Sequence, residues 1–304
     1  MPGEHSQDPH GLVIVDKPQG MTSHDMVAKA RRFFRTRKVG HAGTLDPMAT
    51  GVLVLGLGKA TRLLGRLTAD EKRYHGTIRL GEQTASDDAD GEVVRRASAA
   101  GVALDAIMAG IAALTGEISQ VPPAVSAIKV GGVRAHAAAR AGAALELKAR
   151  QVVVRRFELV AERKLIGADG AELWDLDVEV DCTAGTYIRS LARDLGAGLG
   201  VGGHLSRLRR VASGPFTITQ ARCLASLEAD PSCSMTLDEA ARAAFAARDL
   251  SADQTRDLGH GKKIPAAGVA GEYAGFSPEG SLVALLEERD GKACPTAVFQ
   301  PAGG

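Results

Sequence analysis

The stretch GHAGTLDPMATGVL, residues 40–53, is the most unusual part of this chain of 304 residues. It places Asp46 directly before Pro47, which fixes its own φ and biases Asp46 toward an extended backbone. Residues 35–50 show neither helical nor strand periodicity, and the apolar run Gly51–Gly58 follows them. We therefore expect an ordered functional loop that leads into a buried strand.

The residues around Asp46 allow two interpretations of its role. A carboxylate held beside apolar neighbours is suited to act as a nucleophile or a base. An Asp followed by Pro is also a common helix start, with Asp as the cap and Pro at the first helical position. Taken alone, the pair Asp46-Pro47 is more typical of a helix start.

Outward from this stretch, strands alternate with helices without the regular order of a parallel βαβ protein, which predicts an α+β fold. Apolar alternation and turn signals predict strands at 11–15, 51–58, 72–81, 124–130, 151–164, 172–182 and 204–216. Helical periodicity and capping residues predict helices at 22–34, 59–67, 104–114 and 186–199. The pattern breaks near residues 229–236, so we expect a domain at 10–235 and a small one at 236–304.

Composition fits a soluble globular protein, with 45% hydrophobic and 24% charged residues. No apolar run is long enough to cross a bilayer, and the polar N-terminus is unlike a secretory signal. Four scattered cysteines are typical of a reduced, cytoplasmic protein. Although the net charge is only +1, residues 31–73 hold ten Lys or Arg against three acids, a basic patch of the kind that contacts RNA phosphates.

Several motifs of other protein classes are incomplete. The run GVLVLGLGKAT resembles a phosphate-binding loop, but Leu53 and Ala60 stand where that loop needs Gly and Ser or Thr. Nucleotide hydrolysis is therefore disfavoured. A calcium loop starting at Ser86 lacks its bidentate carboxylate, because Ala97 stands at the twelfth position. The histidines show no zinc-binding spacing, so we expect no metal.

Five segments together are similar to the TruB family of pseudouridine synthases. HAGTLDPMATG resembles the family's catalytic loop, and VDKPQGMTSHD, residues 15–25, resembles its Lys-Pro motif. KRYHGTIRLG with the following TASDDADG resembles the segment that bears the active-site tyrosine. The other two segments are GTYIRSLARDLG, residues 185–196, and HLSRLRRVASGPF, residues 204–216. These matches run in order from about residue 11 to residue 220.

The resemblance implies a pseudouridine synthase fold, with a mixed, largely antiparallel central sheet, flanking helices and an RNA-binding thumb or loop region. It also implies a small β-rich, PUA-like RNA-binding domain at the C-terminus. The implied reaction is isomerisation of uridine 55 in the T-arm of tRNA to pseudouridine by base flipping, without a cofactor. We expect a monomer that needs no protein partner.

The same resemblance gives Asp46, Tyr74 and Arg189 the catalytic roles. Asp46 would act on the ribose or on the base, and the motif leaves open which atom it touches. Arg189 would pair with Asp46 and lower its pKa, since a nearby cation favours the carboxylate. Tyr74 would stack on the flipped base and take part in proton transfer. Each has a simpler interpretation, as a helix cap, a surface arginine and a strand tyrosine.

Substrate-binding roles fall on eight further residues: Lys17, Pro18, His41, Thr44, Asp88, Tyr187, Leu208 and Arg210. His41 would fill the space that the flipped base leaves, and Leu208 would form an apolar wall of the uracil pocket. Four of them also have simpler interpretations when taken singly, as a loop histidine (His41), a core leucine (Leu208), a turn lysine (Lys17) and a turn-capping aspartate (Asp88). A rival hypothesis is a non-catalytic RNA-binding protein on the same fold, which would not need Asp46, Tyr74 and Arg189 together.

Overall fold

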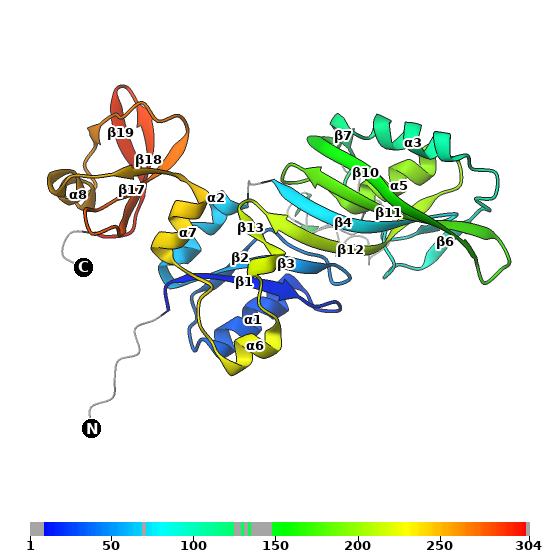
Figure 1. Cartoon of the computed structure of the whole chain (residues 1–304), viewed down its shortest axis with the longest axis horizontal. Coiled ribbons are helices and arrows are strands. Elements are labelled where there is room, and N and C mark those ends of the chain that lie inside the picture. The colour runs from blue at the N-terminus through cyan, green and yellow to red at the C-terminus, as the bar shows by residue number, and fades with distance from the viewer. Residues whose placement is uncertain (1–8, 69–70, 125–128, 131–132, 135–147, 302–304) are drawn as a thin grey trace.

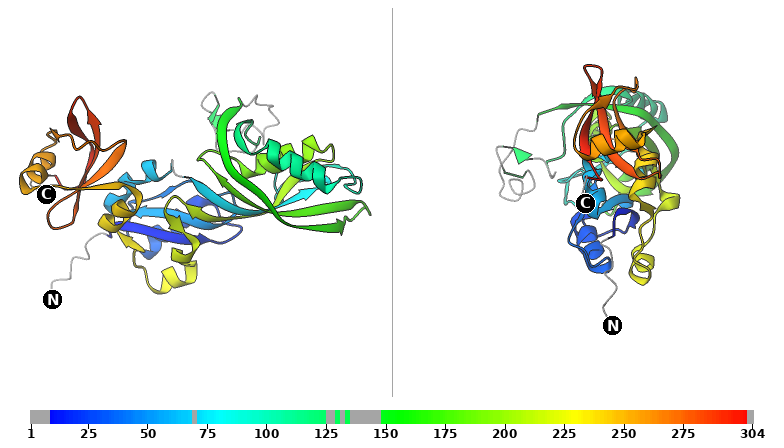
Figure 2. Two further views of the ribbon diagram at one scale, coloured as in Figure 1. Left: turned by 45° about the horizontal axis from the view of Figure 1, so that its top comes forward. Right: turned by 90° about the vertical axis from the view of Figure 1, so that its left-hand side faces the viewer.

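The computed structural model describes residues 9–68, 71–124, 129–130, 133–134 and 148–301. Within this part, ten strands form one long sheet in the order β14-β1-β3-β12-β4-β11-β10-β7, with β2 paired to β3 and β13 to β12. A second sheet of five strands, β15-β17-β18-β19-β16, lies at the opposite end of the molecule from β10 and β11. Figure 2 shows the same elongated arrangement in its left view, and its right view looks at the end of the molecule that carries the second sheet.

The strands of the long sheet are β1 (Gly11–Lys17), β2 (Val39–Ala42), β3 (Thr50–Leu57), β4 (Lys72–Leu80), β7 (Gly116–Gln120), β10 (Arg150–Ile166), β11 (Glu172–Cys182), β12 (Gly203–Ser213), β13 (Phe216–Thr217) and β14 (Met235–Thr236). Two small hairpins are β5 (Glu82–Thr84) with β6 (Val93–Arg96), and β8 (Lys129–Val130) with β9 (Val133–Arg134).

The helices are α1 (Ser23–Phe33), η1 (Gly58–Arg62), α2 (Leu64–Leu67), α3 (Leu104–Ala113), α5 (Ile188–Gly198), η2 (Ile218–Gln220), α6 (Leu224–Ala229), α7 (Leu237–Ala244) and α8 (Ala252–Gly259). The strands of the second sheet are β15 (Ala246–Asp249), β16 (Ile264–Pro265), β17 (Glu272–Phe276), β18 (Leu282–Arg289) and β19 (Lys292–Val298).

The N-terminal half of the long sheet is built on β1 and β3, which pair antiparallel along their whole length. Both strands are almost continuously apolar because helices cover both of their faces. Helix α1 begins with a capping box in which Thr22 accepts a bond from the Asp25 amide and the Asp25 side chain accepts one from Thr22. The predicted strand and helix at these positions are confirmed.

The other half of the sheet alternates between a buried and an exposed face. On β4, Tyr74 and Ile78 point into the core, whereas His75 lies on the opposite face. Helix α5 covers the buried face and packs Leu191 and Leu195 into the same core. The two halves meet where β12 pairs parallel with β3 at only two positions, Arg209 with Thr50 and Arg210 with Gly51.

The second sheet shares a hydrophobic core with the first. Phe276, Leu282 and Phe299 belong to one buried cluster with Leu12 and Val52 of the long sheet. Polar contacts reinforce this junction. The Arg66 guanidinium lies 3.1 Å from the Glu272 carboxylate, and the Asp238 carboxylate accepts a 2.6 Å hydrogen bond from the Leu282 amide.

The predicted α+β class with a mixed, largely antiparallel sheet and a small β-rich C-terminal part is confirmed. Some expectations were wrong in detail. The stretch 35–50 contains the short strand β2, and the predicted helix 59–67 is split into η1 and α2. The strand predicted at 124–130 lies largely outside the described residues. In the described part of the chain, no helix is long and apolar enough to cross a membrane.

Candidate active site

Asp46 lies in the irregular connection between β2 and β3 and does not begin a helix. Instead, the Ala49 amide donates to the Asp46 carbonyl across a turn. Ser23 holds the backbone of Leu45, the residue before Asp46. The Ser23 hydroxyl accepts a hydrogen bond from the Leu45 amide at 2.8 Å and donates one to the Leu45 carbonyl at 3.2 Å. The helix-start interpretation of Asp46-Pro47 is therefore wrong, and α1 provides the anchor of the loop.

Lys17 supports this loop from below. Its ammonium group is fully buried and donates to the carbonyls of Pro18 at 2.9 Å, Met21 at 2.5 Å and Pro47 at 3.3 Å. Burial lowers the pKa of Lys17 to about 8, while the nearby Asp46 carboxylate opposes that shift. Lys17 thus joins the Lys-Pro segment to the residue that follows Asp46.

Arg210 holds the other side of the loop. It is only 1% exposed, and its guanidinium donates to the carbonyls of Val52 at 2.7 Å, Gly43 at 3.0 Å and Thr44 at 3.5 Å. Three carbonyls around one planar fork fix the path of the chain on both sides of Asp46. Arg210 was expected to bind substrate; its contacts show a guanidinium that is largely used by the protein backbone.

The expected ion pair between Asp46 and Arg189 forms, with 3.0 Å between Nε and Oδ2. Arg189 is 4% exposed and also lies 3.2 Å from the Asp88 carboxylate, and it donates to the Ser86 carbonyl at 2.8 Å. Asp88 is itself buried and accepts bonds from the Ser86 hydroxyl and the Asp90 amide. The surface-arginine interpretation is therefore wrong, because two carboxylates share one buried guanidinium.

The pKa of Asp46 is nevertheless raised, not lowered. Burial is the largest cause, Arg189 opposes it, and the negative charge of Asp88 adds to the upward shift. The contribution of Arg189 has the expected direction, but desolvation outweighs it. A carboxylate with a raised pKa is a better proton acceptor than an ordinary surface aspartate.

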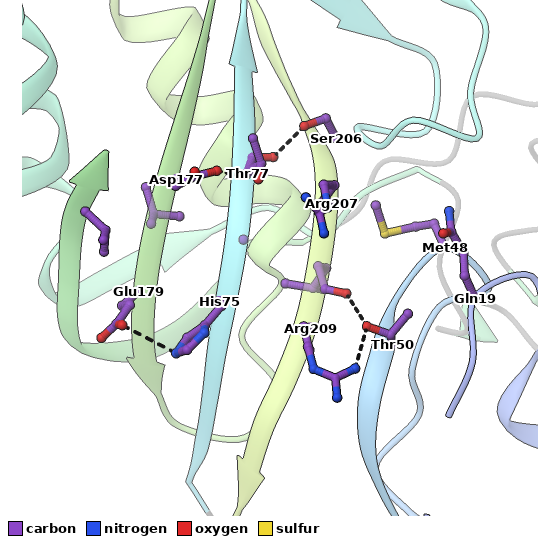
Figure 3. Close-up of a pocket in the computed structure, with 14 residues that line it drawn as sticks. Gln19, Met48, Thr50, His75, Thr77, Asp177, Glu179, Ser206, Arg207 and Arg209 are labelled. Atoms are coloured by element: carbon purple, nitrogen blue, oxygen red, sulfur yellow. Dashed lines mark hydrogen bonds and ion pairs between the residues drawn. The ribbon is translucent and has the colours of Figure 1, made fainter. Parts of the chain in front are cut away.

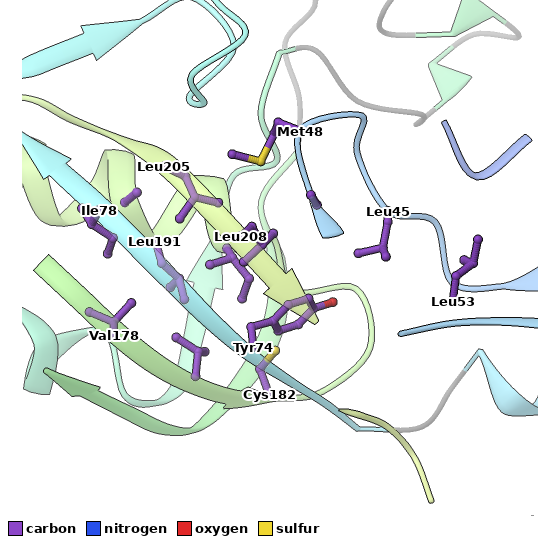
Figure 4. Close-up of a cluster of buried hydrophobic side chains, with 14 of the residues drawn as sticks. Leu45, Met48, Leu53, Tyr74, Ile78, Val178, Cys182, Leu191, Leu205 and Leu208 are labelled. Atoms are coloured by element: carbon purple, nitrogen blue, oxygen red, sulfur yellow. The ribbon is translucent and has the colours of Figure 1, made fainter. Parts of the chain in front are cut away.

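A pocket of about 260 Å³ opens beside Asp46. Thr44, Tyr187, Leu208 and Arg210 line it together with the three expected catalytic residues Asp46, Tyr74 and Arg189. Figure 4 shows the Tyr74 ring beside Leu208, with its hydroxyl on the side away from Ile78 and Leu191. Burial raises the pKa of Tyr74, and Arg210 opposes that shift, so its hydroxyl holds its proton at neutral pH.

The remaining predicted site residues, Lys17, Pro18, His41 and Asp88, do not line this pocket. His41 lies on β2 at the start of the catalytic loop and packs edge-on against His24, with 5.5 Å between the ring centroids. Burial is the first cause of its lowered pKa, followed by the charges of His24 and Arg210. A histidine of this kind is neutral and presents an aromatic ring at pH 7.

The anchoring roles of two residues, Ser23 and Gln120, were not predicted from the sequence. Gln120 is 2% exposed, and its amide bonds both to the backbone N–H of Tyr187 at 2.8 Å and to the Tyr187 carbonyl at 3.1 Å. Both anchors bind backbone groups far away in the chain, which no local pattern reveals. A signal would exist only in a comparison of many related sequences.

A larger pocket, of about 470 Å³, lies on the exposed face of the sheet (Figure 3). Its walls carry His75, Asp177, Glu179 and Arg209, and several of these already form ion pairs with each other or with neighbours. The pocket beside Asp46 is the better candidate because it contains the buried, perturbed groups. Within the described residues, no cluster of three or more His, Cys, Asp or Glu side chains is arranged to hold a metal ion.

Comparison with known proteins gives consistent matches along the chain. Residues 31–188 match the TruB family pseudouridylate synthase N-terminal domain. Residues 189–244 match the tRNA pseudouridylate synthase B C-terminal domain, and residues 245–300 match the C-terminal domain of tRNA pseudouridine synthase II. The first of these matches spans the catalytic loop and the segment that bears Tyr74.

Full-length relatives are also similar. The chain is 55% identical over 289 residues to a protein from Thermobifida fusca named tRNA pseudouridine synthase B, covering 95% of this chain and 98% of the relative. It is 52% identical over 293 residues to a protein of the same name from Nocardia farcinica, covering 96% and 94%.

Among solved structures, the fold is similar to a chain in a crystal structure of a Cbf5-Nop10-Gar1 complex, with a TM-score of 0.71, 27% identity and coverage of 96% of this chain and 85% of that one. A chain of an H/ACA RNP bound to a substrate RNA containing 2′-deoxyuridine shares the fold at a TM-score of 0.68 and 24% identity, covering 96% and 86%. The chain belongs to the TruB family of pseudouridylate synthases, isomerases that act on tRNA.

Proposed function

We propose that this enzyme converts uridine 55 in the T-arm of tRNA to pseudouridine, with Asp46 as the catalytic carboxylate. The observation that carries the proposal is the ion pair of Asp46 with the buried Arg189 at the wall of a pocket of about 260 Å³. Relatives named tRNA pseudouridine synthase B, at 52% and 55% identity over nearly the full chain, support the substrate class.

In the proposed reaction the N1–C1′ bond of the uridine breaks, the uracil turns, and a C5–C1′ bond forms. C5 loses its hydrogen as a proton and N1 gains one, so atoms and electrons balance without an oxidant, a reductant or a further reactant. We therefore propose that no cofactor takes part. Asp46 acts either at the ribose or at the uracil ring, and its raised pKa suits it to receive the C5 proton in the last step.

Tyr74 and Leu208 form the proposed faces of the base site. The Tyr74 ring offers a stacking surface, which tolerates any orientation of the uracil as it turns. Because burial raises the pKa of Tyr74, its hydroxyl stays protonated and acts as a hydrogen-bond donor. Since Tyr74 keeps its proton, we propose that Asp46 is the proton acceptor among the lining residues.

A uridine stacked in a folded loop must leave the stack to enter this pocket, at a cost of a few kcal/mol. We propose that His41, neutral and edge-packed on His24, occupies the space that the flipped uridine leaves. The basic residues Arg35, Arg37 and Lys38 directly before β2 would hold the neighbouring phosphates.

We propose that residues 10–235 form the catalytic domain, including a thumb or loop region that contacts RNA, and that 236–304 form a PUA-like RNA-binding domain. The separate sheet β15–β19 supports the second unit. Because this sheet shares a core with Leu12 and Val52, removing it would expose apolar surface. Charge reversal of the exposed Lys262 and Lys263 is a cleaner test, and should weaken tRNA affinity by about tenfold at low salt.

We further propose a cytoplasmic monomer that acts without a protein partner. The contiguous match of residues 31–300 to domains of this one family supports a self-sufficient enzyme. Light scattering of the protein with and without tRNA tests this point, since a stable dimer would contradict it.

Tritium release tests the reaction and its position together. With tRNA transcribed from uridine labelled with tritium at C5, the proposal predicts release of one tritium for each tRNA. A transcript with cytidine at position 55 should release none. Equal release from both transcripts would contradict the assignment to uridine 55.

A further inference from the structure

Gln120, the last residue of β7, pairs with the backbone of a residue 67 positions later in the chain. Its Oε1 accepts from the Tyr187 N–H at 2.8 Å, and its Nε2 donates to the Tyr187 carbonyl at 3.1 Å. The side chain is 2% exposed. Because both the oxygen and the nitrogen of this buried amide are hydrogen-bonded, the Gln120 side chain and the Tyr187 backbone are held in one relative geometry.

Tyr187 is the residue directly before helix α5, and α5 has no capping side chain of its own. It also has no acidic residue in its first turn. In a capping box, a Glu or Gln three residues into the helix reaches back to the N–H of the capping residue. Gln120 makes the same bond from a neighbouring strand, and so replaces a local cap by a tertiary one.

The residue after Gln120 extends this attachment. The Val121 carbonyl accepts hydrogen bonds from the Ser190 hydroxyl at 3.0 Å and from the Arg193 guanidinium at 2.8 Å. The end of β7 therefore holds α5 at the residue before its start, in its first turn and one turn later. Arg189, whose Nε lies 3.0 Å from Asp46, is located between these points.

We infer that Gln120 is a positioning residue of the reaction, which fixes the start of α5 through Tyr187 and thereby directs Arg189 at Asp46. This role rests on the proposed functions of Asp46 and Arg189. Gln120 does not line the pocket beside Asp46, so its loss should reduce the rate of the chemical step and leave tRNA affinity unchanged.

A second consequence concerns the ionisation of Asp46. Arg189 is the main group that opposes the upward shift of the Asp46 pKa. If the start of α5 loosens and Arg189 moves away, the pKa of Asp46 rises further. The acid limb of the rate profile should then move to higher pH, which a general loss of stability would not produce.

The test compares Gln120→Leu, which keeps the volume but removes both bonds, with Gln120→Glu, which keeps an acceptor for the Tyr187 N–H. Gln220→Leu is the matched control. Gln220 also accepts a 2.8 Å bond from a backbone N–H that precedes a short helix, but it is exposed and lies outside the pocket. Single-turnover rates, tRNA affinity and rate profiles against pH are measured at a temperature where circular dichroism shows every variant folded.

For Gln120→Leu we expect a single-turnover rate at least about tenfold lower, a shifted acid limb and an unchanged Kd. Gln120→Glu should lose less, and Gln220→Leu should match the unmodified protein. A Gln120→Leu rate within about twofold of the unmodified protein, or a loss with no shift of the acid limb, would overturn the inference. Asp46→Ala is measured in parallel: if it is inactive while Gln120→Leu is normal, only this inference fails, whereas an active Asp46→Ala removes the proposed function itself.

Discussion

Arg189 and Asp46 form an ion pair, 3.0 Å between Nε and Oδ2, although they are separated by more than 140 positions in the chain and come from helix α5 and from the connection between β2 and β3. The guanidinium is shared with Asp88, at 3.2 Å. Burial raises the pKa of Asp46 above its ordinary value, and the negative charge of Asp88, which shares the same cation, adds to this shift.

Arg189→Lys tests whether the planar fork is needed. A lysine keeps the charge but has no geometry that serves Asp46, Asp88 and the Ser86 carbonyl together. We expect the single-turnover rate to fall by about 100-fold or more, and the free energy of unfolding to fall by about 3 kcal/mol, because buried Asp88 loses part of its pairing.

The control for this change is Arg163→Lys. Arg163 pairs with Asp177 on the exposed face of the sheet, so its replacement should change unfolding by less than about 0.5 kcal/mol. Urea unfolding and single-turnover assays measure both variants. Equal effects of the two substitutions would contradict the special role of Arg189.

Asp46→Asn should stabilise the protein at neutral pH. Because the folded state raises the pKa of Asp46, the folded protein binds a proton more readily than the unfolded chain, and its stability falls as the pH rises through that pKa. The amide carries no charge and avoids this cost. The Tm of Asp46→Asn should therefore exceed that of the unmodified protein near pH 7, and the difference should shrink toward about pH 4.

Thermal melting across this pH range, combined with an activity assay, decides the point. The prediction is a more stable and inactive variant, a trade-off often found for catalytic groups. A Tm difference that is independent of pH would show that the Asp46 carboxylate is not destabilised by folding.

Gly51 lies where β3 meets β12, next to the catalytic loop. Its φ is +101°, and a Cβ atom there would lie 2.2 Å from the Arg210 carbonyl oxygen. Gly20 also has a positive φ, +82°, but a Cβ there would meet nothing within 4 Å. We expect Gly20→Ala to cost about 1 kcal/mol and Gly51→Ala at least about 2 kcal/mol more, measured by urea unfolding. Equal losses in the free energy of unfolding for the two variants would mean that β3 and β12 can move apart to accommodate a Cβ atom at residue 51.

His41→Ala separates base flipping from chemistry. If the His41 ring replaces the flipped uridine in the loop, its loss should slow modification of folded tRNA by about tenfold and affect an unstructured RNA less. His75, on the exposed face of β4, provides the control, and His75→Ala should leave both rates unchanged. Equal defects of His41→Ala on folded and unstructured RNA would rule out the flipping role.

The sequence predicted the elements that local patterns define. The apolar run of β3, the capping residues before α1 and the alternation along β4 all depend on neighbours in the chain, and each led to the observed element. Strand β2 was missed because its four residues are ordered by pairing with β3, not by a pattern of their own.

The site residues that lie in local motifs were also predicted, whereas the properties of the site that depend on the folded chain were not. Motif residues such as Asp46, Tyr74 and Arg189 do meet at one pocket. The net pKa of Asp46 was predicted in the wrong direction, because desolvation depends on how deeply the loop is packed and not on which cation is near. Ser23 and Gln120 were missed since their partners are backbone groups, whose positions are known only once the chain is folded.

The central claim is that Asp46 carries the chemistry of uridine isomerisation in tRNA. The most direct test incubates the protein and Asp46→Ala with unmodified tRNA transcript and maps pseudouridine by chemical labelling and reverse transcription. The account predicts one new stop in the T-loop with the unmodified protein, no stop with Asp46→Ala, and tRNA affinities of the two proteins within about tenfold, or 1.4 kcal/mol. The same T-loop stop with Asp46→Ala, or tRNA binding without any stop by the unmodified protein, would contradict it.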